Sequence, residues 1–403
     1  MRIIPRKSVS VSFQELWRAT KTLFGGQLIC GPEIELFERR FSQYSNVKYA
    51  ISVCSARLGI RIIFEALGCI PGEKVIMSAY NFPVIPNMIR QIGLEPVFVD
   101  IDPATWNIDC RRIEKCIDER VKYLLVTHMF GQPCNMEPII ALTKKYSLKL
   151  IEDCAHACGS EYKGRKVGSF GEAGCFSFGT GKGLVTFGGG MITTNDEALY
   201  KKMKIALHNL SQPRKVEVMK NLVLGFTTSL CTKKIAYKFL VFPLNFIFAI
   251  LEYDLEEFMD SVGMHNMNDC RARFANVQAA IGLEQLKKIE SLNAQRIKNA
   301  QQLINNLRLF ETLRFPSQID NTKHVHLYFP VKTKHSLSLK KYLMINGIDV
   351  KISSQANCAD AQLQVAEFYA DEVIEVPNYP GLSSLDIEYI AMVIGRFFRY
   401  RHE

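Results

Sequence analysis

The sequence lacks the short motifs that identify several common classes of enzyme. Its twelve cysteines include no CxxC pair, so neither a zinc ribbon nor a thioredoxin-like redox site is expected, and no metal site is predicted. No GxGxxG follows the first strand-like run, which argues against a Rossmann dehydrogenase. The GTGKG run at 179–183 has phenylalanine at 176 and glycine at 183, where the phosphate loop of an NTPase needs glycine and a hydroxyl residue.

Blocks of basic residues and long apolar runs are also missing. The formal net charge of +10 favours anionic partners, but no basic block interleaved with aromatic residues occurs, so nucleic acid is not expected. The apolar run at 239–251 has 13 residues, too few to span a bilayer. Residues 1–10 are basic without the apolar core of a secretory signal, and the cysteines are scattered, so the cytoplasm is the expected compartment.

Short apolar runs alternate with amphipathic stretches through the first half of the chain. Strands are expected at 49–55, 74–77, 96–99, 123–127, 148–151 and 175–178, and helices at 31–48, 55–68, 83–93, 113–119 and 136–146. Such alternation predicts an α/β domain with a mostly parallel sheet covered by helices on both faces.

The pattern changes in the second half. A long helix over 279–307, a strand-like run over 324–332 and a last helix near 385–398 predict a smaller C-terminal α+β domain. We therefore expect a large domain over residues 1–262 and a small domain over residues 263–403.

An apolar insertion at about 208–262 interrupts the large domain. It carries two apolar runs that flank Lys233, Lys234 and Lys238. We favour a buried helical insertion or a dimer contact. A helical pair resting on a membrane surface through 222–251 is the second alternative, and a spanning helix is the third.

The densest stretch of small and polar residues lies at 151–191. Asp153 ends a strand-like run, and the carboxyl ends of parallel strands face the crevice in which α/β sheets bind ligands. Lys182 follows the next strand-like run, in a loop of small residues. Both side chains are therefore expected on the same side of the sheet.

Several blocks, in order along the chain, resemble the DegT/DnrJ/EryC1/StrS family of sugar aminotransferases, which use pyridoxal phosphate on the aspartate-aminotransferase fold. The blocks are GPEIELFERRF, PGEKVIMSAYNF, PVFVDIDPATWNID, HMFGQPCNM, IEDCAHACGSEYKGRKVGSFG and VQAAIGLEQL. They extend from about Gly31 to Phe398, apart from the insertion. Agreement at this many places is far more specific than any single motif.

The resemblance implies a role for each of eight residues. Lys182 matches the lysine that forms the Schiff base, and Asp153 matches the acid that pairs with the pyridine nitrogen. The other six match positions that contact the cofactor: Phe82 against the ring, His156 near its 3-oxygen, and Ser55, Ala56, Arg57 and Ser177 at its phosphate.

The chain departs from the family pattern at four places. Ser55-Ala56-Arg57 replaces Ser-Gly-Thr, and 179–183 lacks the histidine and asparagine that flank the family's lysine. The run 187–190 reads Phe-Gly-Gly-Gly rather than Gly-Glu-Gly-Gly. Of the family's Asn-Tyr-Arg element only Arg273 is kept, and Arg271 stands where an asparagine of the partner subunit often reaches the phosphate.

The resemblance implies a homodimer that moves an amino group from an amino acid, such as glutamate, to a keto-sugar, and the net positive charge favours a nucleotide-linked one. Arg57, Arg271 and Arg273 are candidates for binding the diphosphate. A non-sugar or lipid-linked acceptor is an alternative, and so is a membrane-associated homologue without catalysis. Pyridoxamine-dependent deoxygenation is disfavoured, because that branch of the family has histidine where this chain has Lys182.

Overall fold

The computed structural model describes residues 2–250, 271–359, 363–370 and 372–399. Its largest sheet has the strand order β1-β10-β9-β6-β5-β2-β4. Every neighbouring pair is parallel except the two pairs that β10 forms with β1 and β9. The strands are β1 (Tyr49–Val53), β2 (Lys74–Ser78), β4 (Glu95–Val99), β5 (Val121–Thr127), β6 (Lys149–Asp153), β9 (Ala173–Ser177) and β10 (Gly190–Thr194). The predicted α/β class with a mostly parallel sheet is confirmed.

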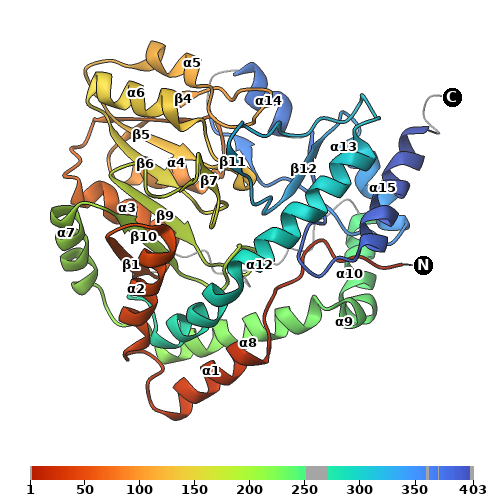
Figure 1. Cartoon of the computed structure of the whole chain (residues 1–403), viewed down its shortest axis with the longest axis horizontal. Helices are drawn as coiled ribbons and strands as arrows, with labels where there is room; N and C mark the ends of the chain where they lie inside the picture. Colours follow the sequence, from red (N-terminus) through yellow and green to blue (C-terminus); the bar gives the residue numbers. More distant parts are fainter. Residues whose placement is uncertain (1, 251–270, 360–362, 371, 400–403) are drawn as a thin grey trace.

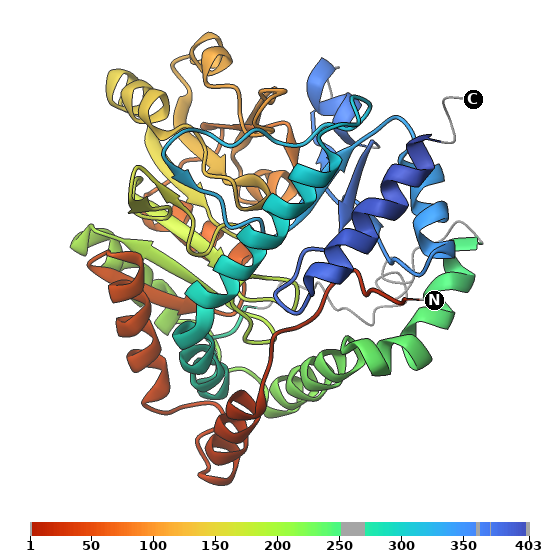
Figure 2. The same cartoon turned by 45° about the vertical axis from the view of Figure 1, so that its right-hand side comes forward.

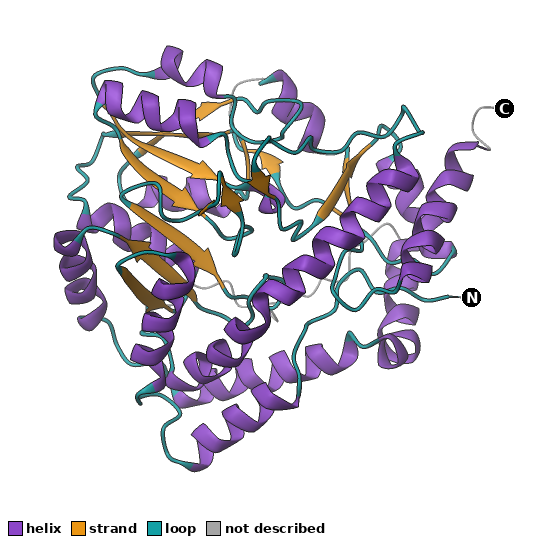
Figure 3. Ribbon diagram, viewed as in Figure 1, coloured by secondary structure: helices purple, strands orange, loops and turns teal. Residues whose placement is uncertain are grey.

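Helices cover both faces of this sheet (Figures 1 and 3). Successive side chains of a strand point to opposite faces, so Val75 and Met77 of β2 join one apolar cluster and Ile76 joins another. The first cluster includes α3 (Ala56–Ala66), α4 (Val84–Gln91) and α7 (Glu197–His208). The opposite face is covered by α2 (Glu33–Ser45), α6 (Met136–Tyr146) and the start of α12 (Asn276–Leu307).

A second, antiparallel sheet lies in the C-terminal part of the chain. It has the order β12-β15-β13, from β12 (Phe329–Lys332), β13 (Lys351–Ile352) and β15 (Val373–Val376). It packs with α13 (Ser336–Ile345), α15 (Ser384–Arg399) and the end of α12, which runs diagonally past both sheets (Figure 2). Ile4 belongs to this core and pairs with Ile348. The predicted domain boundary at 262/263 lies outside the described residues.

Small elements connect the two sheets and edge the cavity described below. The pair β3 (Tyr80–Asn81) and β14 (Ala356–Asn357) joins the two parts of the chain, with α14 (Gln364–Ala370) beside it. A three-stranded sheet contains β7 (Glu161–Tyr162), β8 (Arg165–Lys166) and β11 (Thr322–Lys323).

Two predicted elements are wrong in extent. The helix expected over 113–119 consists of α5 (Cys110–Ile113) and a 3-10 turn, η1 (Glu114–Cys116). It starts earlier because the Asp109 side chain accepts a hydrogen bond from the Arg111 N–H and caps it. The strand expected over 324–332 is confined to β12, because His326 has a φ of 46° and breaks the extended run. A further short 3-10 turn is η2 (Met129–Gly131).

The first helix, α1 (Phe13–Phe24), was not predicted. Ser12 and Glu15 form a capping box at its start, in which the Ser12 N–H donates to the Glu15 carboxylate. The Ser-x-x-Glu pattern before an apolar run is a recognised sign of a helix start, so the sequence contained the signal.

The described part of the insertion is helical. It contains α8 (Lys215–Cys231), α9 (Lys234–Ala236), a π-helical turn η3 (Tyr237–Val241) and α10 (Phe242–Ile250). Val218 and Leu222 of α8 are buried, and Gly225 lies so close to Phe187 that a Cβ there would clash with the ring. Among the described residues, no helix combines the length and the apolar character needed to cross a bilayer.

Asp349 ties the insertion and the N-terminal segment to the C-terminal sheet. Its buried carboxylate accepts hydrogen bonds from Arg6 Nε at 3.2 Å, from Asn245 Nδ2 at 2.9 Å and from the Tyr237 hydroxyl. Because all three donors come from segments far from residue 349 in sequence, this single side chain holds three parts of the fold together.

We expect Asp349→Ala to lower the free energy of unfolding by about 3 kcal/mol, because it removes the buried acceptor that Arg6, Tyr237 and Asn245 share. Urea unfolding monitored by circular dichroism measures this. Asp320→Ala removes an exposed acid and is the control, with an expected change within about 0.5 kcal/mol. Equal midpoints for the two variants would contradict the role of Asp349.

Candidate active site

A cavity of about 650 Å³ opens at the carboxyl ends of the parallel strands. The eight residues selected from the sequence all line it: Ser55, Ala56, Arg57, Phe82, Asp153, His156, Ser177 and Lys182. Ser55, Ala56 and Arg57 lie at the start of α3, and the other five lie at the ends of β3, β6 and β9 or in the loops that follow them. This is the edge at which α/β sheets bind ligands.

Lys182 enters the cavity from the loop after β9. The loop turns at Gly179, whose carbonyl accepts from the Lys182 N–H at 3.0 Å. Within the described residues, the Nζ atom makes no hydrogen bond or ion pair, and it lies 6.0 Å from the centre of the Tyr328 ring. Burial lowers the pKa of Lys182 to about 8, although Asp153 and Glu375 act in the opposite direction. The fraction of this amine that is neutral and nucleophilic near neutral pH is therefore larger than for an ordinary lysine.

Asp153 is the last residue of β6 and is 4% exposed. Burial raises the pKa of its carboxyl, while the Ala155 N–H at 2.9 Å and the charge of Lys182 lower it. A buried carboxylate whose pKa is raised by burial gains stabilisation when a cationic group binds against it. The position therefore suits a cationic or protonated ligand atom.

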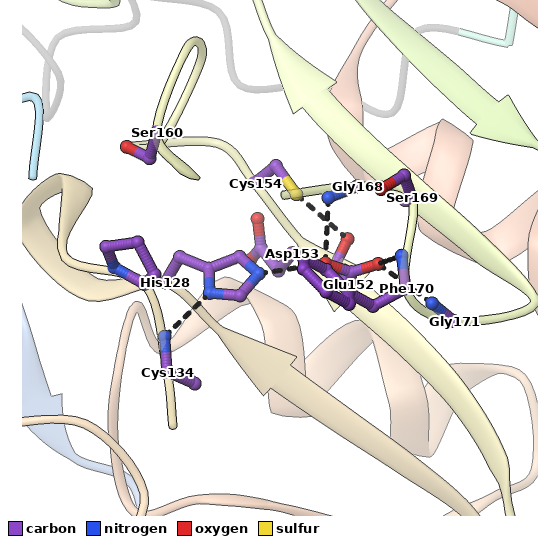
Figure 4. A network of polar contacts seen from close by, with 12 residues as sticks. His128, Cys134, Glu152, Asp153, Cys154, Ser160, Gly168, Ser169, Phe170 and Gly171 are labelled. Carbon is purple, nitrogen blue, oxygen red and sulfur yellow. Dashed lines mark hydrogen bonds and ion pairs between the residues drawn. The ribbon is translucent and has the colours of Figure 1, made fainter. Parts of the chain in front are cut away.

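Glu152, one residue earlier, points to the other side of the strand. There it lies at the centre of a network of hydrogen bonds (Figure 4). It is 0% exposed, and its two oxygens accept backbone N–H groups from Gly168, Phe170 and Gly171 at 2.6–2.9 Å. It also contacts His128 Nε2 at 3.1 Å. Since the Cys134 N–H donates to His128 Nδ1, the Nε2 atom carries the proton and donates to Glu152.

His128, Glu152 and Cys154 also form the one group of potential metal ligands found among the described residues, with ligand atoms within 4.8 Å of one another. Both imidazole nitrogens and both carboxylate oxygens already make hydrogen bonds. Burial raises the pKa of the Cys154 thiol well above its usual value, so the sulfur is not the thiolate that metals prefer. The cluster is a hydrogen-bond network that fixes the end of β6.

The start of α3 forms another wall of the cavity. Ser55 Oγ accepts from the Leu58 N–H at 3.2 Å and caps the helix. The positive end of the helix dipole is thereby directed at the cavity, beside Arg57 and Ser177. Across from it, Gly189 has a φ of 96°, and a Cβ at this position would lie 2.2 Å from the Phe274 ring. Only glycine fits this close approach.

Two of the three predicted diphosphate-binding arginines line the cavity. Arg57 and Arg273 do so, whereas Arg271 is exposed and is not among the lining residues. The Arg273 guanidinium donates to the carbonyls of Leu210 at 3.1 Å and His208 at 2.6 Å. Two N–H groups of this guanidinium are therefore committed to the backbone.

His156 is held between two aromatic rings. Phe130 stacks on it at 6.3 Å, and Tyr328 meets it edge-on at 5.1 Å. Burial lowers the pKa of His156 well below its usual value, so the imidazole is neutral. Its Nδ1 is buried and makes no hydrogen bond within the described residues. A polar atom in that position suits a site completed by a ligand.

The lining residues that the sequence did not point to include Tyr328, Glu375 and Arg296. Tyr328 donates to the Gly181 carbonyl at 3.1 Å and so supports the loop that carries Lys182. These residues come from the C-terminal half, more than 100 positions beyond Lys182. No local motif connects them to the site.

Comparison with known proteins shows which family the chain matches. The model of the DegT/DnrJ/EryC1/StrS aminotransferase family matches residues 11–235 and 257–394. The chain is 28% identical to the spore coat polysaccharide biosynthesis protein SpsC of Bacillus subtilis, covering 96% of this chain and 94% of that protein. It is also 28% identical to GDP-perosamine synthase of Caulobacter vibrioides, with coverages of 87% and 86%.

Two solved structures have the same fold. The aminotransferase from Psychrobacter cryohalolentis gives a TM-score of 0.80 at 25% identity, covering 98% of this chain and 99% of that one. NtdA from Bacillus subtilis, solved with bound cofactor PMP, gives 0.77 at 23% identity, with coverages of 99% and 86%.

The environment of Lys182 predicts its pH dependence. An amine-specific reagent applied to cofactor-free protein should label Lys182 with a midpoint near pH 8, because only the neutral amine reacts. Since the Asp153 charge raises this pKa, Asp153→Asn should move the midpoint to lower pH. Peptide mass spectrometry measures the labelling, with exposed Lys298 as internal reference for the reagent. A midpoint near 10.4, the ordinary lysine value, or an upward shift in the variant would be inconsistent with this electrostatic account.

Proposed function

The chain belongs to the DegT/DnrJ/EryC1/StrS aminotransferase family, and on that premise we propose that it transfers an amino group from glutamate to a nucleotide-linked keto-sugar. The predicted enzyme class, a pyridoxal-phosphate-dependent aminotransferase related to enzymes of sugar and polysaccharide biosynthesis, is confirmed. The residue assignments and the identity of both substrates are our proposals. These proposals rest on one observation, namely that Lys182 and Asp153 line the same cavity. Asp153 ends β6, and Lys182 lies in the loop after the neighbouring strand β9.

The cavity residues fit pyridoxal phosphate. Asp153 would hold the pyridine nitrogen, and Phe82 would pack on the ring. The Nδ1 of His156, which has no hydrogen-bond partner in the described part of the chain, would meet the 3-oxygen. Ser55, Ala56, Arg57 and Ser177 would hold the phosphate at the start of α3. When bound there, the cofactor supplies an electron sink and carries the amino group between the two substrates.

Lys182 would do the proton chemistry. With a pKa of about 8, its Nζ can both accept and donate a proton near neutral pH, as a general acid–base catalyst requires. Its loop rests on Tyr328 through the Gly181 carbonyl, which restricts where the amine can reach. The charge of Asp153 raises the pKa of this amine and so opposes the effect of burial.

The acceptor is proposed from the relatives and from charge. GDP-perosamine synthase, by its name, makes a nucleotide-linked amino sugar. The net charge of +10 and the arginine at position 57 favour an anionic acceptor. A non-sugar or a lipid-linked acceptor is the alternative, and the following experiment tests the non-sugar one.

To test the acceptor, the cofactor-loaded protein is treated with glutamate, purified, and offered nucleotide keto-sugars or simple 2-oxo acids. Return of the cofactor's visible absorption with a nucleotide keto-sugar is expected. Return with 2-oxo acids alone would refute the sugar assignment while leaving the aminotransferase intact. Lys182→Ala should keep its circular dichroism spectrum and lose the complete reaction by about a thousandfold or more.

We further propose a cytoplasmic homodimer in which α8 and α10 contact the second copy. Val216, Val223 and Leu230 recur every seven residues on one face of α8 and are 58–80% exposed. Leu244 and Ile247 of α10 are also exposed. Because α8 also lines the cavity, a copy bound there would close the site from outside.

The membrane alternative is weakened because Lys234, one of the three lysines on which it depended, forms an ion pair with Asp386.

Leu230→Asp should convert a dimer into a monomer at micromolar concentration, because it places a charge in the apolar contact. Sedimentation velocity measures this. Leu309→Asp changes an exposed leucine outside these helices and is the matched control. A monomeric natural protein that floats with anionic liposomes would contradict the dimer contact and support the membrane alternative.

A further inference from the structure

Arg296 is a buried cation for which the described part of the chain supplies no buried anion. It lies on α12, is 6% exposed and lines the cavity. Its Nη1 donates to Asn293 Oδ1 at 2.9 Å, and no carboxylate pairs with it among the described residues. Burial lowers its pKa to about 10, so the guanidinium still carries its charge at neutral pH. A buried charge of this kind is costly unless an anion compensates it.

The position of Arg296 connects it to the reacting lysine. It interacts electrostatically with Cys158 and Tyr328. Tyr328 in turn supports the Lys182 loop, and its ring centre is 6.0 Å from Lys182 Nζ. Tyr328 therefore links the buried guanidinium to the amine, since it interacts with both.

Asn293 fixes the guanidinium in place. This asparagine is fully buried, and its Nδ2 donates to the Cys158 carbonyl at 2.9 Å while its Oδ1 accepts from Arg296. The turn that carries His156 and Cys158 thus positions the arginine through a neutral side chain. An aspartate of the same size here would neutralise Arg296, and the sequence has the amide instead.

We propose that Arg296 binds a carboxylate of the amino-acid donor. This inference rests on the proposed function and assigns its donor subsite. The planar guanidinium can bind both oxygens of a carboxylate, and an anion at this position would remove the cost of the buried charge.

The depth of Arg296 favours the donor over the diphosphate of the acceptor. In an amino acid the α-carboxylate is attached to the carbon that bears the reacting amine, so its receptor must lie close to Lys182. In a nucleotide sugar the whole sugar ring can separate the diphosphate from the reacting carbon. Cations nearer the surface, such as exposed Lys220 of α8, line the outer part of the cavity. The cofactor phosphate is already assigned to the start of α3.

The test compares Arg296→Gln with Arg308→Gln, an exposed arginine at the end of the same helix. In the donor half-reaction, Arg296→Gln should raise the glutamate concentration for half-maximal loss of the visible band by about a hundredfold. The response of the glutamate-treated protein to the acceptor should stay within a few-fold of the natural protein. Arg308→Gln should change neither.

Two further measurements separate binding from folding. Glutarate, a dicarboxylate without an amine, should bind the natural protein in calorimetry and fail to bind Arg296→Gln. Asn293→Asp retains the arginine but supplies an internal anion, so it should also weaken glutarate binding. If Arg296 only stabilised the fold, Asn293→Asp would leave glutarate binding unchanged.

The outcomes distinguish the two proposals. If the natural protein exchanges amino groups and Arg296→Gln keeps the natural glutamate response, only the donor subsite is overturned. If Arg296→Gln raises the half-saturating concentration of the acceptor instead, the arginine binds phosphate and the proposal is also overturned. If the natural protein itself does not respond to glutamate but does exchange with another amino donor, the choice of donor in the proposed function fails.

Discussion

The site depends on the burial of one amine, that of Lys182. Lys182 has no anionic partner within ion-pair distance among the described residues, and its pKa is about 8 because burial outweighs the charges of Asp153 and Glu375. For the pKa to settle near this value, Asp153 must be close enough to raise the pKa of the amine but too far away to form an ion pair with it. The parallel pairing of β6 with β9 provides that spacing, since Asp153 ends one strand and the Lys182 loop follows the other.

Because side chains alternate along β6, the successive acids Glu152 and Asp153 lie on opposite faces of the sheet and have different roles. Asp153 points into the cavity, whereas Glu152 points to the opposite side, where it accepts three backbone N–H groups and the His128 N–H. Glu152 is fully satisfied, so it holds the strand end rigid and contributes no chemistry. Among the described hydrogen bonds, the Asp153 carboxylate accepts only the Ala155 N–H, which leaves oxygen capacity for a ligand.

Much of this arrangement could be predicted from the sequence. Lys182, Asp153 and the other six selected residues lie near strand ends or helix starts, and all line one cavity. Arg296 and Tyr328 could not be predicted, because α12 and the loop before β12 reach the site only through tertiary packing. The extent of α5 was wrong because a local cap at Asp109 decided its start. The start of α1 was missed although Ser12 and Glu15 signalled it.

The central claim is that the cofactor is attached to Lys182, and one measurement tests it directly. Protein loaded with pyridoxal phosphate is reduced with borohydride, which fixes the bond between cofactor and lysine, then digested and mapped by mass spectrometry. The account predicts a pyridoxyl group on the peptide that contains Lys182, and loss of this modified peptide when the loaded protein is first treated with glutamate to release the lysine. A pyridoxyl group on any other lysine, with Lys182 unmodified, would contradict it.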